Sequence, residues 1–294
     1  MKPLLPTIAG VGPSSRWLPA GPWKTVLDFL GEQYPQVDVE TWTVRMARGE
    51  VLEENGRAVD PETPYRTGAC IFYYREVDDE KVIPYVERVL YQDEHILVAD
   101  KPHFLPVIPS GQFLRQTLLV RLRQKYHLES LVPIHRLDRE TAGVVLFSVD
   151  PKTRGDYTSL FRNRKVRKVY EALAPTLDAA TFPTIRRSRI VRGEPFFRMK
   201  EVPGEANSET AVRPVRDLDR HSLYQLIPVT GRKHQLRLHL AGLGIPIIND
   251  RLYPVISRTR TDDFSSPLKL LAKSLSFQDP ISGRELYFES GMKL

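Results

Sequence analysis

The most constraining feature of the sequence is a charged loop that leads directly into an apolar run, at residues 135–147 (HRLDRETAGVVLF). Residues 144–147 are too few for a helix and rich in β-branched side chains, which predicts a buried strand. Asp138 therefore lies in the loop that enters this strand, and catalytic groups are commonly displayed on such loops. Because its neighbours are basic, this carboxylate should stay ionised, either as a structural ion-pair partner or as a nucleophile or base.

Composition narrows the class of protein and its partners. The chain has 294 residues, 41% of them hydrophobic, which suits about two globular domains. Its formal net charge of +7 favours a polyanionic partner. The single cysteine, Cys70, excludes a disulfide within the chain and a thiolate metal cluster, and it suits a reducing cytoplasm. No apolar stretch approaches the roughly 18 residues of a membrane span, so we expect a soluble, uncleaved chain with no membrane contact.

The domain organisation follows from proline and charge. Residues 1–22 contain Pro3, Pro6, Pro13, Pro19 and Pro22, which predicts an extended, proline-rich arm. Residues 23–77 are predicted to form a compact module whose first helix lies near 25–30. A charged linker at 78–84 then leads to a second domain at 85–294.

The N-terminal module contains a basic helix followed by a turn. Residues 39–47 predict the helix, and Asn55–Gly56 predicts a tight turn between two short strands. The run 44–51 (VRMARGEV), followed by this turn, resembles the S-four-like RNA-binding module named after a small-subunit ribosomal protein. That resemblance implies a small α/β RNA-binding domain in which Arg45 and Arg48 face phosphates. On the residues alone, the two arginines could equally be an ordinary solvated helix face.

Three segments of the second domain have clear secondary-structure patterns. Residues 96–101 predict a buried strand that Pro102 ends. Leucines at four-residue spacing in 112–126 predict an amphipathic helix. Residues 165–173 alternate basic and apolar side chains, which predicts a strand with one face toward phosphate.

A second polar segment opens a predicted helix at residues 231–243, which Gly244 ends. Thr230 is expected to be its N-cap, which places Arg232 in the first turn. A guanidinium at this position can hold a carboxylate through two hydrogen bonds, which a lysine could not do as well.

The residues also leave other chemistry to consider. His135, His234 and His239 could suggest a metal site, but His234 and His239 are five residues apart and do not share a helix face, so we expect no metal. A serine hydrolase is unsupported because no Gly-x-Ser-x-Gly motif occurs. A glycosidase would need a second carboxylate beside Asp138, for which Glu140 is the only nearby candidate.

Together, three segments resemble the RluA-type RNA pseudouridine synthases: residues 135–143 (HRLDRETAG), 168–172 (KVYEA) and 230–237 (TGRKHQLR). The resemblance extends from about residue 23 to the end of the chain. Two departures are small: Lys233 stands where many relatives have threonine, and Ala142 replaces a frequent serine. The family implies an α+β pseudouridine synthase fold, with a largely antiparallel mixed sheet, flanking helices and a cleft across the sheet.

The activity that this resemblance implies is isomerisation of specific uridines in rRNA or tRNA to pseudouridine, without a cofactor. Asp138 would act covalently, at ribose carbon 1 or at uracil carbon 6. Tyr170 would pack on the uracil, Arg232 would pair with Asp138, and Leu236 would line the uracil pocket. Arg136 would fill the space left by the flipped base or bind its phosphate, unless it is only an ion-pair partner. Further candidates are His135, Arg139 and Thr141 for substrate, and Arg45, Arg48, Lys165, Arg167, Lys168 and the basic region 186–200 for RNA.

The main alternative is a non-catalytic RNA-binding or ribosome-assembly factor that keeps the fold. The presence of Asp138, Tyr170 and Arg232 together argues against it. In either case RNA is the expected partner. We expect a cytoplasmic monomer with no obligatory protein partner.

Overall fold

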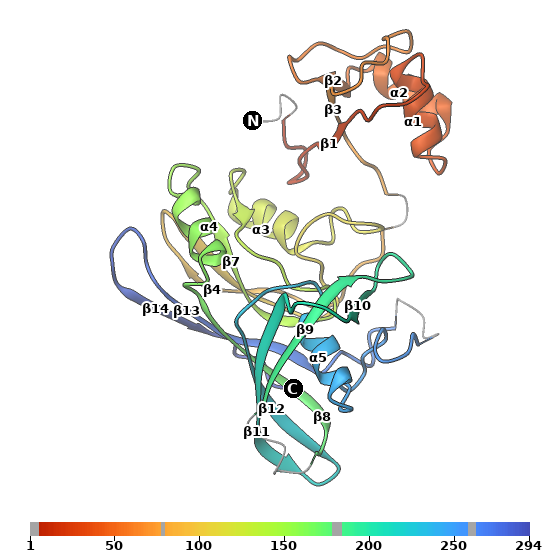
Figure 1. Ribbon diagram of the computed structural model, residues 1–294. Helices are drawn as coiled ribbons and strands as arrows, with labels where there is room; N and C mark the ends of the chain where they lie inside the picture. The colour runs from red at the N-terminus through yellow and green to blue at the C-terminus, as the bar shows by residue number, and fades with distance from the viewer. Residues whose placement is uncertain (1–5, 78–79, 178–183, 258–262) are drawn as a thin grey trace.

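The chain folds into an N-terminal module and a larger catalytic domain (Figure 1). The computed structural model describes residues 6–77, 80–177, 184–257 and 263–294. Residues 1–5 of the predicted arm and residues 78–79 of the predicted linker lie outside the described residues.

The N-terminal module packs two helices against a three-stranded antiparallel sheet in the order β1-β3-β2. Its first helix begins where Thr25 accepts a hydrogen bond from the backbone N–H of Asp28, whose carboxylate accepts one from that of Thr25 in return. The core includes the fully buried Phe29 and Trp42. These elements are β1 (Ser14–Trp17), α1 (Val26–Gln33), α2 (Val39–Ala47), β2 (Val51–Glu53) and β3 (Cys70–Tyr73). The predicted helices and the turn at Gly56 are confirmed.

The extended arm is expected from the sequence either to lie across the body or to be mobile, and its predicted boundary with the module, between residues 22 and 23, is wrong. Strand β1 lies within the predicted arm, yet it pairs with β3 and forms the edge of the module sheet. Before it, the carbonyl oxygens of Ala9 and Gly10 accept hydrogen bonds from Gln124 and Arg123 of helix α3 (Leu118–Tyr126), at 2.6 and 3.2 Å. The start of the chain therefore connects the module to the catalytic domain.

The catalytic domain is built on one 11-stranded sheet, whose main path runs in the order β10-β9-β11-β12-β8-β13-β7-β5-β4. Strand β14 pairs with β13, and β6 pairs with β7. All pairs are antiparallel except β7 with β13, so the expectation of a largely antiparallel mixed sheet is confirmed. The strands are β4 (Arg88–Gln92), β5 (Ile96–Lys101), β6 (Val132–Pro133), β7 (Ala142–Ser148), β8 (Arg167–Pro175), β9 (Thr184–Arg192), β10 (Met199–Val202), β11 (Ser208–Leu218), β12 (His221–Pro228), β13 (Leu270–Gln278) and β14 (Glu285–Glu289).

Helices cover both faces of the sheet where the strands are most apolar. Leu97 of β5 and Val145 of β7 pack with α3, while Ile96 and Val144 face the opposite side and pack with α4 (Arg154–Arg162). This two-sided burial explains why every residue of β5 and β7 is buried, rather than alternate residues only. A third helix, α5 (Gln235–Gly242), packs on β8, β11 and β12.

The parallel pair between β7 and β13 depends on a glycine. Gly143 has φ +116°, and a Cβ atom at this position would lie 2.2 Å from the carbonyl oxygen of Ala272 on β13. Only glycine allows the strands to approach this closely. Because Gly143 follows the loop of Asp138, the same approach fixes where that loop leaves the sheet.

None of the helices in the described part of the chain combines the length and apolar character needed to cross a membrane.

Candidate active site

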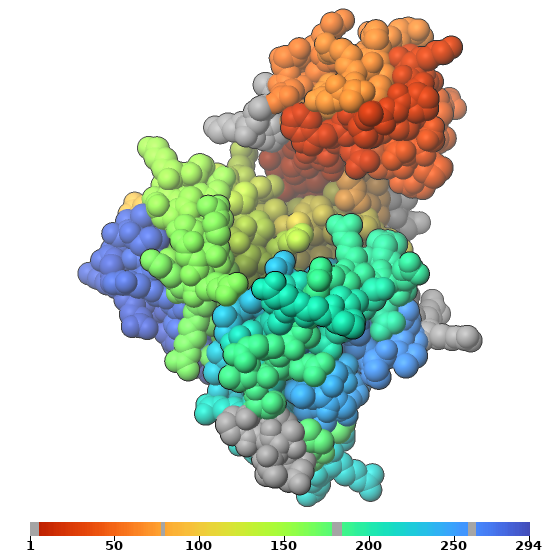
Figure 2. Space-filling view, in the orientation of Figure 1, coloured from red at the N-terminus to blue at the C-terminus, as the bar shows by residue number. Residues whose placement is uncertain are grey.

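Asp138 lies in a cavity of about 820 Å³ at the centre of the catalytic domain. Figure 2 shows the surface hollowed between the lime-green residues around α4 and the green hairpin of β9 and β10, below the red and orange N-terminal module. The cavity is lined by the loop of residues 135–141 that carries Asp138, which we call the catalytic loop, by β8 and by the segment that precedes α5. Predicted site residues in its lining are His135, Arg136, Asp138, Arg139, Thr141, Lys168, Tyr170, Arg232 and Leu236.

Lys101, the last residue of strand β5, binds the backbone of the catalytic loop. The fully buried ammonium of Lys101 donates to the carbonyl oxygens of Pro102, Leu105 and Arg139, at 3.0, 2.8 and 3.2 Å. Burial lowers the pKa of Lys101 to about 7, and the charges of Glu140 and Asp138 oppose that shift. The loop is closed by a turn in which Thr141 N–H donates to the carbonyl of Asp138. Asp138 is therefore placed by contacts of its own carbonyl and of the carbonyl of Arg139, which follows it.

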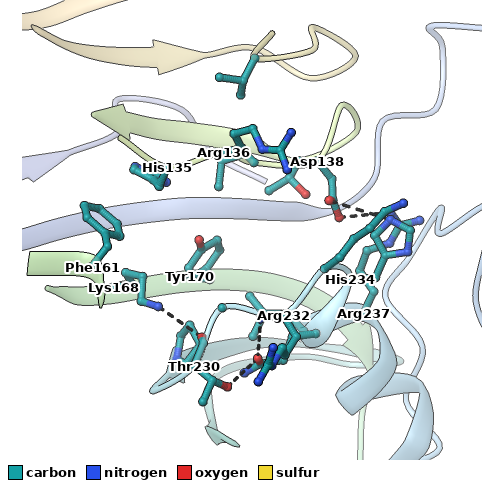
Figure 3. Close-up of a pocket in the computed structure, with 18 of the residues that line it drawn as sticks. His135, Arg136, Asp138, Phe161, Lys168, Tyr170, Thr230, Arg232, His234 and Arg237 are labelled. Atoms are coloured by element: carbon teal, nitrogen blue, oxygen red, sulfur yellow. Dashed lines mark hydrogen bonds and ion pairs between the residues drawn. The ribbon is translucent and has the colours of Figure 1, made fainter. Parts of the chain in front are cut away.

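Arg237, rather than Arg232, is the arginine that reaches Asp138. Its Nη1 lies 3.5 Å from Oδ2 of Asp138, while its Nε and Nη2 hold Asp250 at 2.8 and 2.6 Å (Figure 3). The Arg237 side chain is 3% exposed, and its paired carboxylates raise its pKa above the ordinary value against the opposing effect of burial. The predicted pairing with Arg232 is wrong: this residue is exposed, and its Nε donates to the carbonyl of Asn207.

The reason is that α5 begins later than predicted. His234 takes a left-handed conformation, with φ 58°, and the helix starts only at Gln235. Thr230 is not the N-cap; its hydroxyl and the backbone N–H of Arg232 both donate to the side-chain oxygen of Gln235, at 2.6 and 3.1 Å. This shift leaves Arg232 in the loop and puts Arg237 in the first turns of the helix.

Tyr170 and Leu236 line the cavity beside Asp138. Figure 3 shows the Tyr170 ring between the loop of Asp138 and the segment around Thr230. Burial raises the pKa of the Tyr170 phenol well above its ordinary value, and the negative charge of Asp138 raises it further. The ring therefore stays protonated at neutral pH and offers a flat apolar face with a hydroxyl at its edge.

Two histidines at the site are held in the neutral form. His135 accepts a hydrogen bond from the backbone N–H of Leu146 and stacks on Phe161, with ring centroids 4.7 Å apart. Burial lowers its pKa to about 3. His234 hydrogen-bonds through Nδ1 to the hydroxyl of Tyr253 at 2.8 Å, and burial lowers its pKa to about 4 although the charge of Asp138 opposes this. At neutral pH both rings are therefore uncharged, and they support the site through hydrogen bonds and packing.

Most of the charged side chains that line the cavity are positive. Asp138 is the only acidic residue among the described residues that line it, against eight arginines and lysines. Glu140, which a glycosidase would need as a second carboxylate, is paired with Arg139 and does not line the cavity. Among the described residues no group of three metal-binding side chains comes together. The arrangement suits one nucleophilic carboxylate acting on a polyanion.

Several predicted contacts with substrate or RNA are changed by the structure. Arg45 is 7% exposed, pairs with Glu76 and lies over Trp42, so the prediction that it faces phosphates is wrong. Arg139 lines the cavity, where its guanidinium donates to Glu140 and lies over the ring of Phe113.

Other predicted RNA contacts remain accessible. Arg48, Lys165 and Arg167 are exposed but do not line the cavity. Lys168 does line it, and its ammonium donates to the carbonyl of Thr230. The exposed Arg162 and Arg164 at the end of α4 also line the cavity and were not predicted, although their place just before the basic strand is a usable signal. The roles of Arg237, Asp250 and Tyr253 were not predicted either.

Comparison with known proteins identifies the family to which this fold and this site belong. Residues 95–242 match the family described as RNA pseudouridylate synthase, and the chain belongs to that family. It is 32% identical over 232 residues to an uncharacterized RNA pseudouridine synthase of Synechocystis, covering 78% of this chain and 79% of the relative. It is 31% identical over 211 residues to the dual-specificity RNA pseudouridine synthase RluA of Haemophilus influenzae, covering 70% and 93%.

The solved structures agree with the sequence comparisons. Human RNA pseudouridylate synthase domain containing 4 superposes with a TM-score of 0.54 at 27% identity, covering 70% of this chain and 88% of that one. The particular branch that the relatives indicate is the RluA type, as the motifs around Asp138 and Arg237 predicted. The chain is thus an isomerase that forms pseudouridine in RNA, and these findings favour this activity over a non-catalytic binding factor.

Proposed function

We propose that the chain isomerises uridines of ribosomal or transfer RNA with Asp138 as the covalent nucleophile. The observation that carries this assignment is that Asp138 is the only carboxylate among the described lining residues, with Arg237 3.5 Å away. Two relatives support the RNA classes: one is named a tRNA pseudouridine(31) synthase, and another a dual-specificity enzyme. The proposal also includes a cytoplasmic location and a monomeric enzyme.

The reaction replaces the bond between N1 and the ribose by a bond between carbon 5 and the ribose. In one route the carboxylate of Asp138 displaces N1 from ribose carbon 1, uracil turns within the cavity, and carbon 5 displaces the carboxylate from the ribose. In the other route the carboxylate adds to uracil carbon 6, the bond between N1 and the ribose breaks, uracil turns, carbon 5 bonds to the ribose, and the carboxylate is expelled from carbon 6. In both routes the hydrogen of carbon 5 passes to solvent and N1 gains a proton. Atoms and electrons balance without a redox partner. Arg237 orients Asp138 and places a positive charge beside it, and Tyr170 provides a flat surface for the turning base.

The target uridine must leave its stack to reach the cavity, which costs a few kcal/mol. The exposed cations at the rim, Arg136, Arg162, Arg164, Arg232 and Lys233, are placed to bind the phosphates of the flipped nucleotide and its neighbours. The exposed Arg48 of the N-terminal module would add contacts to the RNA backbone.

The test is tritium release from RNA labelled at carbon 5 of uridine, run in parallel on ribosomal and transfer RNA. Wild type should release tritium from at least one fraction, and Asp138→Asn should release none while binding RNA as wild type does. Asp156→Asn is the matched control, because this exposed aspartate lies on α4 outside the cavity lining. Release by Asp138→Asn at the wild-type rate would refute the assignment of the nucleophile.

A further inference from the structure

The most exposed large hydrophobic side chain among the described residues is Phe196, at the tip of the β9–β10 hairpin. It is 87% exposed, and its neighbour Phe197 is 39% exposed, with the two rings edge to face at a centroid distance of 5.6 Å. Figure 1 shows this hairpin turn projecting from the sheet on the side where the N-terminal module lies. An aromatic pair displayed at a projecting tip is typical of a binding surface.

The tip is held at a defined place relative to the active site. Within the turn, Gly193 N–H donates to the carbonyl of Arg198, at 3.0 Å, and Arg198 N–H donates to that of Pro195, at 2.8 Å. Lys233, which lines the cavity, donates to the carbonyl of Phe197 at 3.1 Å. The tip is therefore attached directly to the rim of the cavity.

A second connection runs through Tyr253. Its hydroxyl accepts from Met199 N–H and donates to the carbonyl of the same residue, at 2.8 and 3.1 Å, and it also hydrogen-bonds to His234 beside Asp138. The guanidinium of Arg198 lies over the Tyr253 ring at 4.9 Å. A ligand that binds the hairpin tip is thus placed in register with the reacting base.

The charge around the tip selects the kind of ligand. Between residues 189 and 200 there are four arginines or lysines and one glutamate. Arg192 and Lys200 are exposed, whereas Arg186 and Arg187 lower in the stem are paired with Glu201 and Glu209. Aromatic rings beside cations are the combination that binds unpaired nucleotides, through stacking on the base and charge on the phosphate.

We propose that Phe196 is a stacking platform for an unpaired base next to the flipped uridine, with Arg192 on one face of the hairpin and Lys200 on the other available to adjoining phosphates. The inference rests on the proposed function and names a substrate contact for it. Flipping the uridine exposes the faces of neighbouring bases, and the platform covers one of them. Since every base has a flat face, this contact favours single-stranded loops without reading their sequence.

The experiment compares wild type with Phe196→Ala, Phe196→Leu and Phe196→Trp. For each protein it measures KM and kcat for tritium release from purified RNA, and the Kd of the protein for the same RNA. Alanine should raise both KM and Kd by roughly 5- to 150-fold, the range that corresponds to the loss of one stacked base, and leave kcat at saturating RNA unchanged. Leucine keeps the apolar area without the ring and should resemble alanine, whereas tryptophan should resemble wild type. Tyr287→Ala is the matched control, because Tyr287 is a 60% exposed aromatic on β14, far from the cavity lining.

Two results would overturn the platform. Unchanged KM and Kd in Phe196→Ala would show that the ring does not bind RNA, and would assign the tip to a protein contact instead. Wild-type behaviour of Phe196→Leu beside a weakened Phe196→Ala would show apolar packing rather than stacking. Failure of the proposed function is separate: wild type would then release no tritium from either RNA class, and the Kd series would still decide on the platform.

Discussion

Arg237 reaches Asp138 with only one of its nitrogens, Nη1 at 3.5 Å from Oδ2, because its other donors are committed to a second carboxylate. The nucleophile is therefore oriented by a cation that is itself fixed elsewhere. Such an arrangement orients the carboxylate while leaving it able to form a bond, since a full two-pronged ion pair would occupy both of its oxygens.

Arg237 and Arg232 should differ sharply in what their substitution changes. Arg237→Gln should lower kcat by about 100-fold or more, as expected for loss of a preorganised charge, with a smaller change in KM. Arg232→Gln should raise KM and leave kcat near wild type, because Arg232 is exposed at the rim. Steady-state tritium release separates the two, and the opposite pattern would restore the pairing predicted from sequence.

The stability of Arg237 variants needs its own control. Removing the arginine leaves Asp250, whose side chain is 1% exposed, as an unpaired buried charge, which should cost about 3–5 kcal/mol in the free energy of unfolding. Arg237→Gln combined with Asp250→Asn should recover most of that loss but not the activity. Urea denaturation of the single and double variants tests this, and recovery of activity in the double variant would contradict the role given to Arg237.

Gly143→Ala should disrupt the centre of the sheet. The new methyl group would meet the Ala272 carbonyl at 2.2 Å in a backbone conformation with positive φ, so the variant should either fail to fold or lose several degrees in Tm together with activity. Gly155→Ala, on α4 with nothing within 4 Å of a new Cβ, should instead be neutral or slightly stabilising. Equal Tm values for the two variants would refute this account.

Lys101→Met should weaken the support under the catalytic loop. The substitution leaves three carbonyl oxygens without their donor, at about 1–3 kcal/mol each, partly offset because a buried ammonium is no longer required. A net loss of roughly 2–4 kcal/mol is expected, with a fall in kcat as Asp138 becomes less ordered. Lys152→Met, at an exposed position, is the control, and equal urea midpoints for the two variants would remove Lys101 from this role.

Because His135 and His234 are neutral in the fold, we expect the free energy of unfolding to fall at acid pH. In the unfolded chain both take up protons near pH 6.5, whereas in the fold the pKa values of His135 and His234 are about 3 and about 4. The unfolded state therefore binds more protons below pH 6.5, and stability should fall as the pH drops from 6.5 toward 4. His135→Gln, which keeps an acceptor for Leu146 N–H, should flatten this fall in thermal denaturation, while the exposed control His221→Gln should not.

Binding of RNA should depend on the arginines at the end of α4. Arg162→Gln and Arg164→Gln should each reduce the slope of log K against log salt by about 0.7, the value for one phosphate contact on a single strand. Arg187→Gln should change the slope less, because Arg187 is paired with Glu209. Equal slopes for all three variants would contradict a phosphate-binding rim.

The parts of the fold and site that sequence could predict are those set by local pattern. The apolar run before Ser148 predicts β7, and with it the loop that displays Asp138. The left-handed turn at His234 has no such signal. The sequence pattern therefore predicts a helix that begins before Gln235, and it places Arg232 rather than Arg237 beside Asp138. Arg45 resembled a solvated helix residue because its partner, Glu76, lies 31 residues away.

The contacts of the chain's first residues bear on how the protein is made. Gly10 and Ala9 bond to residues 113 and 115 positions later, and β1 pairs with a strand more than fifty residues downstream. During synthesis, the contacts of Ala9 and Gly10 therefore cannot form until α3 has been made. The module sheet can form once β3 has been made, but the α3 surface that Val11 covers stays incomplete until α3 follows, so the module and the larger domain are joined only by this later event.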